Sequence, residues 1–207
     1  MSDVVYKVTQ DHSLIKKTIE LRSYIYHNDK NMTGLLSKGQ RDVYDNDDNT
    51  HTIVITKDSK IIGSVRVTVR TPENGAKLPI EDMGLCLEDL FPNLSLNRIN
   101  IVQYSKLLIN PDHRDTSILL GLFVELKSLS MKLNVQYGIL DTNVDYRCRL
   151  FCALCKKIKL KAQVLDNLYI PPNESTEYVE PRVVVVNFTS EDNVDTIFFP
   201  STKYLRR

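Results

Sequence analysis

Residues 100–126 read NIVQYSKLLINPDHRDTSILLGLFVEL, and this stretch decides the fold. It begins with a strongly apolar segment, residues 100–109, which predicts a strand, and NPDHRDTS follows as a polar loop. Thr116 or Ser117 can cap a helix that runs to about Leu133. That helix has an apolar face at helical spacing, formed by Leu119, Leu122, Phe123, Leu126 and Leu129.

The loop between this strand and this helix has the layout of an anion site. The first backbone N–H groups of a helix have no partner within it, and the helix dipole adds positive potential there. His113 and Arg114 can add side-chain contacts to a phosphate. An ordinary strand-to-helix turn has the same layout, so the loop by itself leaves both interpretations open.

The elements on either side indicate one mixed sheet. Long antiparallel strands come first and a βαβα unit follows, which predicts an α/β (α+β) fold rather than a doubly wound parallel one. Asp11 or Ser13 can cap the first helix, and short helices are expected near Leu35 and within residues 84–92. No linker or repeat divides the chain, so a single domain over residues 1–207 is expected. Strands are expected at 4–9, 51–56, 61–70, 137–142, 164–170 and 181–188, and long helices at 13–27 and 145–157.

Charge balance and cysteine content argue against several classes of protein. Lys plus Arg number 27 and Asp plus Glu number 26, which disfavours nucleic-acid binding through bulk charge. The N-terminal MSDVVYKV does not have the pattern of a signal peptide, and no apolar run approaches the length of a membrane span. Four cysteines are too few and too clustered for a secreted disulfide framework, so a reducing, cytoplasmic location is expected.

Three of the cysteines have the spacing C-x3-C-x2-C, which holds iron–sulfur clusters in some enzymes. Cys148, Cys152 and Cys155 lie, however, in a predicted helix, where this spacing puts all three on one face. Packing against the sheet is therefore the favoured interpretation. The histidines are dispersed and show no zinc-protease spacing. We expect no metal ion and no permanently bound cofactor.

The element order and the loop before the second long helix resemble the GNAT acyltransferase superfamily. The resemblance implies a central parallel pair of strands that splay apart, helices on both faces of the sheet, and a pantetheine arm bound in the gap. The loop pattern Arg/Gln-x-x-Gly-x-Gly/Ala matches residues 114–119, where Ser117 and Leu119 replace the small residues that let a backbone approach phosphate closely. The resemblance assigns donor binding to Leu107, Leu108, Ile109, His113, Arg114, Asp115, Thr116, Ser117 and Ile118.

A further series of motifs is similar to the acyl-homoserine lactone (autoinducer) synthases and the N-acyl amino acid synthases. Those families carry Arg-x-x-x-Phe on the first helix, Asp-x-x-Asp before a hairpin, Arg on the next strand and Glu-x-x-Arg on the central strand. The matching residues here are Arg22 and Tyr26, Asp42 and Asp45, Arg66, and Gln103 and Lys106. The resemblance covers roughly the first 140 residues in order and type.

These residue types suit an acceptor that carries an ammonium and a carboxylate. Asp42 and Asp45 can hold the amine or organise basic side chains, while Arg22 and Arg66 can bind a carboxylate or pair with the aspartates. Simple ion pairing that holds the loop is the alternative for any one residue. We predict that Asp42, Asp45 and Arg66 form one charged cluster at the mouth of the acyl site, with Arg22 nearby.

The departures from the family pattern shift the expected chemistry. Gln103 cannot act as a base and Lys106 lacks a guanidinium fork, while Met32 lies about where autoinducer synthases carry a tryptophan. These changes weaken the case for S-adenosylmethionine as the acceptor. Proton removal can then proceed through water, with Asp45 as the best candidate for a base. The GNAT resemblance implies a tyrosine as proton donor to the leaving thiolate, and Tyr137 or Tyr146 could fill that role.

The sequence therefore predicts an enzyme. It would move an acyl group, plausibly a fatty one, from an acyl carrier protein or coenzyme A thioester to the amine of an amino acid or related metabolite. The phosphopantetheine thioester would be a co-substrate, and an acidic carrier protein a possible partner. A catalytically inactive GNAT-fold binding module and a small-acyl N-acetyltransferase are the alternatives. Acyl length, acceptor, carrier and oligomeric state stay open at this point.

Overall fold

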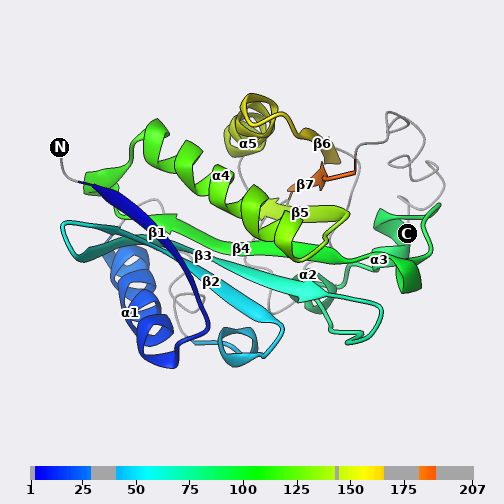
Figure 1. Ribbon diagram of the computed structural model, residues 1–207, viewed down its shortest axis with the longest axis horizontal. Helices are drawn as coiled ribbons and strands as arrows, with labels where there is room; N and C mark the ends of the chain where they lie inside the picture. The colour runs from blue at the N-terminus through cyan, green and yellow to red at the C-terminus, as the bar shows by residue number, and fades with distance from the viewer. Residues whose placement is uncertain (1–2, 29–40, 143–144, 166–181, 190–207) are drawn as a thin grey trace. The chain divides into compact units, whose positions relative to one another are not determined.

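The computed structural model describes residues 3–28, 41–142, 145–165 and 182–189 (Figure 1). Its strands are β1 (Val4–Thr9), β2 (Thr50–Lys57), β3 (Lys60–Arg70), β4 (Ile101–Ile109), β5 (Tyr137–Thr142), β6 (Lys161–Leu165) and β7 (Arg182–Asn187). Its helices are α1 (His12–Asn28), α2 (Pro79–Asp82), α3 (Leu87–Leu90), α4 (Thr116–Lys132) and α5 (Asp145–Lys157). Short 3-10 helices are η2 (Val43–Asn46), η3 (Leu96–Arg98) and η4 (Pro111–His113).

The strands form one sheet in the order β1-β2-β3-β4-β5-β7-β6. Neighbouring strands are antiparallel at β1/β2, β2/β3, β5/β7 and β6/β7. The predicted mixed, mostly antiparallel sheet is thus confirmed, while the splaying of a central parallel pair stays a prediction. The strand expected at 164–170 is described only as far as Leu165, and the helix expected near Leu35 lies outside the described residues.

The chain forms two compact units. The first contains Met1–Thr68 and Tyr104–Leu129, and the second contains Val69–Gln103 and Ser130–Arg207. Strands β3 and β4 contribute residues to both units. A single domain over residues 1–207 therefore stays a prediction, and each unit is described by itself.

The first unit has helices on both faces of its strands. Tyr6, Ile55 and Gly63 form one cross-strand row, and Thr52 pairs with Arg66 three residues away along the strands. Because side chains alternate along a strand, the two rows face opposite sides. The row that contains Tyr6 faces α4, whereas the row that contains Arg66 faces α1 and the loop after it (Figure 1).

Tyr6 joins β1 to the start of α4. Its hydroxyl donates a hydrogen bond to the Ile118 carbonyl at 2.8 Å. The helix can approach this closely because residue 121 is a glycine: a Cβ there would lie 2.3 Å from the Tyr6 hydroxyl oxygen. Burial and the nearby Glu125 carboxylate raise the pKa of Tyr6, so the phenol keeps its proton and remains a donor.

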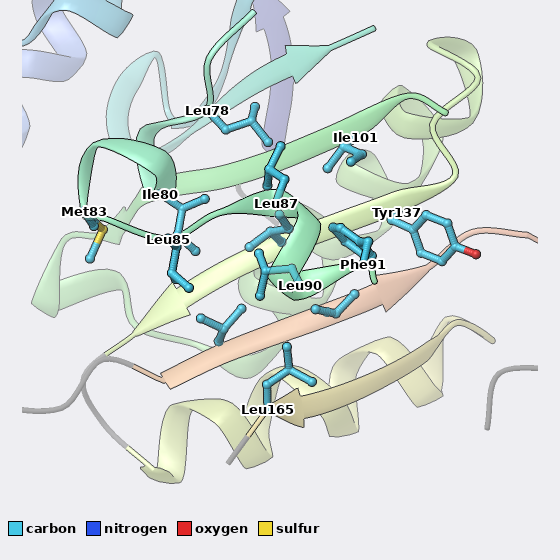
Figure 2. Packing of buried hydrophobic residues seen from close by; sticks show 13 residues of the cluster. Leu78, Ile80, Met83, Leu85, Leu87, Leu90, Phe91, Ile101, Tyr137 and Leu165 are labelled. Carbon is cyan, nitrogen blue, oxygen red and sulfur yellow. The ribbon is translucent and has the colours of Figure 1, made fainter. Parts of the chain in front are cut away.

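The second unit has its own apolar core (Figure 2). Leucines and isoleucines from α2, α3 and their flanking turns pack onto residues of β4, β5, β6 and β7. Phe91 and Tyr137 lie within this core with ring centroids 5.3 Å apart. Helices of four residues are not stable by themselves, so tertiary packing holds α2 and α3 in place. The buried members are Leu78, Ile80, Met83, Leu85, Leu87, Leu90, Phe91, Ile101, Tyr137, Ile139, Leu165, Val183 and Val185.

The cysteine-bearing face of α5 packs inward. Cys148 and Cys155 are buried, Cys152 is half-buried, and α5 contacts β6 and β7. Burial raises the pKa of Cys155 to about 12, so its thiol is not ionised at neutral pH. The predicted packing role is confirmed for the two buried cysteines. Within the described ranges, no helix has the length and apolar character that crossing a membrane requires.

Candidate active site

The aspartate pair Asp42 and Asp45 builds its own turn. Asp42 caps η2, because its Oδ1 accepts a hydrogen bond from the Tyr44 N–H at 3.1 Å. The Asp45 carboxylate returns to accept the Asp42 N–H at 3.0 Å, which completes a capping box. The spacing Asp-x-x-Asp thus has a local structural reason, and the turn fixes the orientation of both carboxylates.

Asp45 is the centre of a buried charge cluster. Arg22 of α1 donates two hydrogen bonds to it, from Nη1 to Oδ1 at 3.2 Å and from Nη2 to Oδ2 at 2.7 Å. Arg66 of β3 donates to Oδ1 as well, at 3.2 Å. The Asp45 side chain is only 4% exposed, and those of Arg22 and Arg66 are 5% and 4% exposed. Bidentate, charge-assisted bonds of this kind fix the geometry of all three groups.

Arg66 ties this cluster to two further elements. Its Nη1 forms an ion pair with Asp42, and its Nε donates to the Ser105 hydroxyl on β4 at 3.0 Å. Its guanidinium also lies over the Tyr44 ring, 5.4 Å from the ring centroid, in cation–π range. The prediction that Asp42, Asp45 and Arg66 form one cluster with Arg22 nearby is therefore correct in geometry.

Lys106 is the third cation beside the two aspartates. Its Nζ lies 3.6 Å from the Asp42 carboxylate, and its backbone is left-handed, with φ of 53°. Successive residues of a regular strand face opposite sides, so this conformation explains how Lys106 and the adjacent Ser105 both reach the cluster. Burial, followed by the charges of Arg22 and Arg66, lowers the pKa of Lys106 to about 8 against the opposing effect of the aspartates.

The electrostatics of Asp45 differ from those expected for a base. Burial raises the pKa of this carboxyl, but hydrogen bonding and charge from Arg22, with the charge of Arg66, outweigh burial and hold the pKa below its usual range. Both oxygens already accept two hydrogen bonds each. A carboxylate with this environment holds other groups in place more readily than it accepts a proton.

Tyr26 lies one helical turn beyond Arg22 and belongs to the core. It is buried with Ile25 and Leu108, and the half-buried Leu21 packs against them. The predicted Arg-x-x-x-Tyr motif thus divides into a charged residue that meets the cluster and an aromatic residue that packs α1 onto β4.

The loop before α4 has the predicted strand–loop–helix form with a different cap. The helix begins at Thr116, and the cap is Asp115, whose carboxylate accepts the Ser117 N–H at 2.6 Å. Hydrogen bonds from the Ser117 side chain and from its backbone N–H lower the pKa of Asp115. The expectation that Thr116 or Ser117 caps the helix was wrong because the preceding carboxylate reaches the first free N–H. In α1 the same chemistry selects Asp11, which accepts the Ser13 N–H at 2.7 Å.

The predicted donor residues divide into buried and exposed groups. The side chains of Leu108, Ile109 and Ile118 are buried, so only their backbone is available to a ligand. Arg114 is exposed, and its Nε donates to the Ile109 carbonyl at 3.2 Å, which fastens the loop to the end of β4. Leu107 and His113 are half-buried, and Asp115, Thr116 and Ser117 are exposed.

The second unit holds the other predicted catalytic residues. Gln103 is 1% exposed and hydrogen-bonded on both sides, to the backbone of α2 and to the Asp141 carboxylate of β5. Tyr146, in the first turn of α5, is 57% exposed and lies beside Arg147. The roles assigned to Gln103 and Tyr146 stay predictions.

Three residues of these networks were not anticipated. Ser105 and Tyr44 contact Arg66, and Asp141 contacts Gln103. Asp141 carried a signal, since it is a charged residue within the apolar strand YGILDT, and such a group needs a polar partner. Ser105 and Tyr44 had no comparable signal, because small polar and aromatic residues are common in strands and turns.

The sheet order and the helices on its strands define a GNAT-like fold, and solved structures agree. The acyl-homoserine lactone synthase LasI has a TM-score of 0.60 at 14% identity, with 91% of this chain and 92% of that chain covered. The acyl-homoserine lactone synthase BjaI, solved with SAM and isopentyl-CoA, has a TM-score of 0.57 at 13% identity, with 92% and 85% covered. NAA60 of Arabidopsis thaliana, solved with acetyl-CoA, has a TM-score of 0.53 at 12% identity, with 91% and 100% covered.

The particular family is shown by a sequence model. The model of the N-acyl amino acid synthase FeeM family matches residues 12–146, more than half of the chain, and the chain belongs to that family. The solved FeeM structure, from uncultured soil microbes, has a TM-score of 0.56 at 8% identity, with 90% of this chain and 91% of that chain covered. No curated protein matches the sequence. The predicted resemblance to N-acyl amino acid synthases is confirmed, and the chain is an N-acyltransferase.

Proposed function

We propose that this enzyme joins an acyl group from a thioester donor to the amine of an amino acid or related metabolite. The observation that supports the proposal is the cluster of Arg22, Asp45 and Arg66, with Asp42 and Lys106 at its edge. Burying several charges costs free energy, so a cluster of this size is weak evidence for stability by itself. Its position in the segment matched by the family model supports a functional reason.

Within the cluster we assign Asp45 to positioning rather than to proton transfer. Asp45 holds Arg22, Arg66 and the η2 turn together, and its low pKa makes it a poor proton acceptor. Lys106 is the cation that we assign to the carboxylate of the acceptor. Its side chain is 19% exposed, more than either guanidinium, and a pKa of about 8 leaves it largely protonated at neutral pH.

The donor would lie along the end of β4 and the start of α4. Structures of BjaI and NAA60 contain isopentyl-CoA and acetyl-CoA, which supports a coenzyme A thioester for this chain too. The Asp115 carboxylate, however, occupies the Ser117 N–H that a phosphate would use. A carrier-protein thioester is therefore kept as a second donor. Tyr146 remains the proposed proton donor to the leaving thiolate. The proposed location is a reducing compartment such as the cytoplasm, which the four free cysteines support.

The test is an acyl-transfer assay on the purified chain. Short- and long-chain acyl-CoA and acyl-carrier protein are each incubated with a mixture of amino acids, and mass spectrometry searches for N-acyl products while thiol release is followed. New N-acyl amino acids from the wild type, and their loss in Arg66→Met, are expected. A wild-type chain that releases no thiol and forms no N-acyl product with any donor would overturn the proposal.

Donor binding has a separate readout. Coenzyme A that binds the folded chain raises Tm by mass action, and Arg114→Ala should reduce that rise. A matched control is Arg98→Ala, because Arg98 is an exposed residue of η3, away from the loop in sequence. If Arg114→Ala and Arg98→Ala leave the same rise in Tm, the assignment of residues 107–118 to the donor is wrong.

A further inference from the structure

The second unit has a strongly basic segment that the proposed acyl transfer does not explain. Residues 146–165, which run from α5 into β6, contain six lysines and arginines and neither aspartate nor glutamate (Figure 1). Setting these six aside from the 27 basic residues of the chain leaves 21, against 26 acidic residues, so the excess of positive charge is concentrated here. The six are Arg147, Arg149, Lys156, Lys157, Lys159 and Lys161.

The basic side chains of α5 lie on its outer face. Arg149, Lys156 and Lys157 are exposed, whereas Cys148 and Cys155 are buried against the sheet. Spacings of seven and eight residues put the three basic side chains on one side of a helix, opposite the buried face. Lysines 159 and 161, in the turn after the helix and at the start of β6, are exposed as well. We call these five exposed residues the α5–β6 basic surface.

Most of these charges are not neutralised by the described residues of the chain. The side chains of Arg149, Lys156, Lys157 and Lys159 make no ion pair and no hydrogen bond with any described residue. The helix dipole gives Lys156 and Lys157 a structural reason, because cations in the last turn of a helix are favourable. It gives none for Arg149, which lies in the middle of α5.

Lys159 occupies a position where glycine is the usual residue. The turn after α5 is a Schellman motif, in which the Leu160 N–H donates to the Cys155 carbonyl at 2.9 Å and the Lys159 N–H to the Lys156 carbonyl at 3.1 Å. Lys159 has φ of 58°, a left-handed conformation that glycine adopts without the steric cost of a Cβ. Lysine is therefore a costly choice for the backbone here, and its side chain adds only charge to the surface.

The composition of the α5–β6 basic surface favours a lipid bilayer over a folded partner. Four of its five residues are lysines, and protein–protein interfaces are enriched in arginine and depleted in lysine. An ammonium is a hydrated point charge without the fixed fork of a guanidinium, so it suits a diffuse layer of phosphate head groups. Ile158 and Leu160 are half-buried between the lysines, which adds apolar surface that can meet the boundary of the acyl chains.

We propose that the α5–β6 basic surface docks the chain on an anionic membrane surface. The association is peripheral and electrostatic, with the lysines at the level of the head groups. It does not depend on the proposed acyl transfer, because the surface and its charges exist without substrate. The two proposals are nevertheless compatible, since a fatty acyl product would partition into the bilayer on which the enzyme is docked.

The test is cosedimentation of the full chain with lipid vesicles. One set of vesicles is phosphatidylcholine alone, and the other contains about one third phosphatidylglycerol, so that only the second is anionic. The wild type should bind the anionic vesicles only, and raising the salt from about 0.1 M to about 1 M should release it as screening shortens the range of the attraction. Lys156→Gln with Lys157→Gln should lower the partition coefficient by roughly fivefold for each lysine removed. The matched control is Lys16→Gln with Lys17→Gln, an exposed lysine pair of α1, which should leave the partition coefficient unchanged.

Lys159→Gly separates membrane binding from stability. Glycine relieves the left-handed backbone of residue 159, so Tm should rise. The same substitution removes a charge from the surface, so the partition coefficient onto anionic vesicles should fall by roughly fivefold. Because the two changes have opposite directions, a loss of binding in this variant cannot result from a loss of folded protein.

Several results would overturn the membrane proposal. Equal binding of the wild type to neutral and anionic vesicles is one, and an equal loss of binding in the α1 control pair is another. Binding of a poly-glutamate or a DNA duplex through the α5–β6 basic surface, by a chain that does not bind anionic vesicles, would assign the surface to an acidic protein or a nucleic acid instead.

The membrane proposal and the proposed function can fail separately. A chain that binds anionic vesicles through this surface but transfers no acyl group confirms the first and removes the second. A chain that transfers acyl groups but does not bind the vesicles overturns the membrane proposal and leaves the function standing.

Discussion

Asp45→Asn is the substitution that most directly probes how the charge cluster is held. The side chains of Arg22 and Arg66 are 5% and 4% exposed, and both donate to Asp45. Asparagine keeps one oxygen but replaces the other with an amino group, which then faces donors from Arg22 and from the Asp42 backbone. Two buried guanidiniums would also lose a negative partner.

The expected loss follows from the burial of the pair. Breaking a buried ion pair by removing one partner costs about 3–5 kcal/mol, and the retained oxygen favours the lower end. For a chain of this length, roughly 3 kcal/mol corresponds to a fall in Tm of about 6–12 °C. Thermal unfolding followed by circular dichroism at pH 7 measures it. Asp58→Asn is the matched control, since Asp58 is an exposed turn residue with φ of 50°, which asparagine tolerates.

The same variant has a pH signature with a definite sign. The folded-state pKa of Asp45 is depressed, so its contribution to stability is present above its unfolded-state pKa of about 4 and is lost as pH falls through the lower folded-state value. The Tm difference between wild type and Asp45→Asn should therefore be constant above about pH 5 and shrink in more acid solution. A Tm for Asp45→Asn within about 1 °C of wild type at pH 7 would refute the view that Asp45 neutralises two buried cations.

Three further sets of substitutions test other parts of the structure. Lys106 has its pKa lowered to about 8, so wild type should gain stability relative to Lys106→Met as pH rises from about 8 to 10, and equal pH profiles in chemical denaturation would contradict this. Cys155→Ala should lower the free energy of unfolding by about 1–2 kcal/mol and Cys152→Ala by less, because the first thiol is buried; stoichiometric iron in purified protein would show that the packing interpretation is wrong. Gly121→Ala should cost about 1–3 kcal/mol by overpacking against Tyr6, and adding Tyr6→Ala should recover part of it; a Tm unchanged in Gly121→Ala would argue against the close approach of α4 to β1.

The predictability of the site depended on how local each interaction was. The spacing of Asp42 and Asp45 is that of a capping box, and Arg22 and Arg66 match motifs of the family. The contact between the arginines and the aspartates was therefore predictable from the order of these motifs. The donors around Asp45 disfavour the role of base that the sequence led us to expect. Their number could not be predicted, because they are side chains brought from α1 and β3. Sequence order predicts that groups meet, but their net electrostatics depend on burial and on every partner at once.

The helix caps show the same limit on a smaller scale. Both Asp11 and Asp115 compete with hydroxyl-bearing neighbours for the first free N–H of a helix, and in each case the carboxylate is the group that accepts it. The pattern allowed either residue, since aspartate, serine and threonine are all good caps. The choice changes the interpretation of the donor loop, because Asp115 brings a negative charge to the helix end where a phosphate was expected.

The sequence by itself determined the order and kind of the long elements, the family, and the residues of the charged cluster. Those features depend on apolar periodicity and on short motifs, which are local properties of the chain. Only the tertiary structure decided which carboxylates are neutralised, that Gln103 donates a hydrogen bond to Asp141, and that residue 121 must be small for Tyr6 to reach Ile118. These contacts join residues 38 or more positions apart, and hydrogen-bond direction and close packing at such separations follow from three-dimensional geometry that no local pattern encodes.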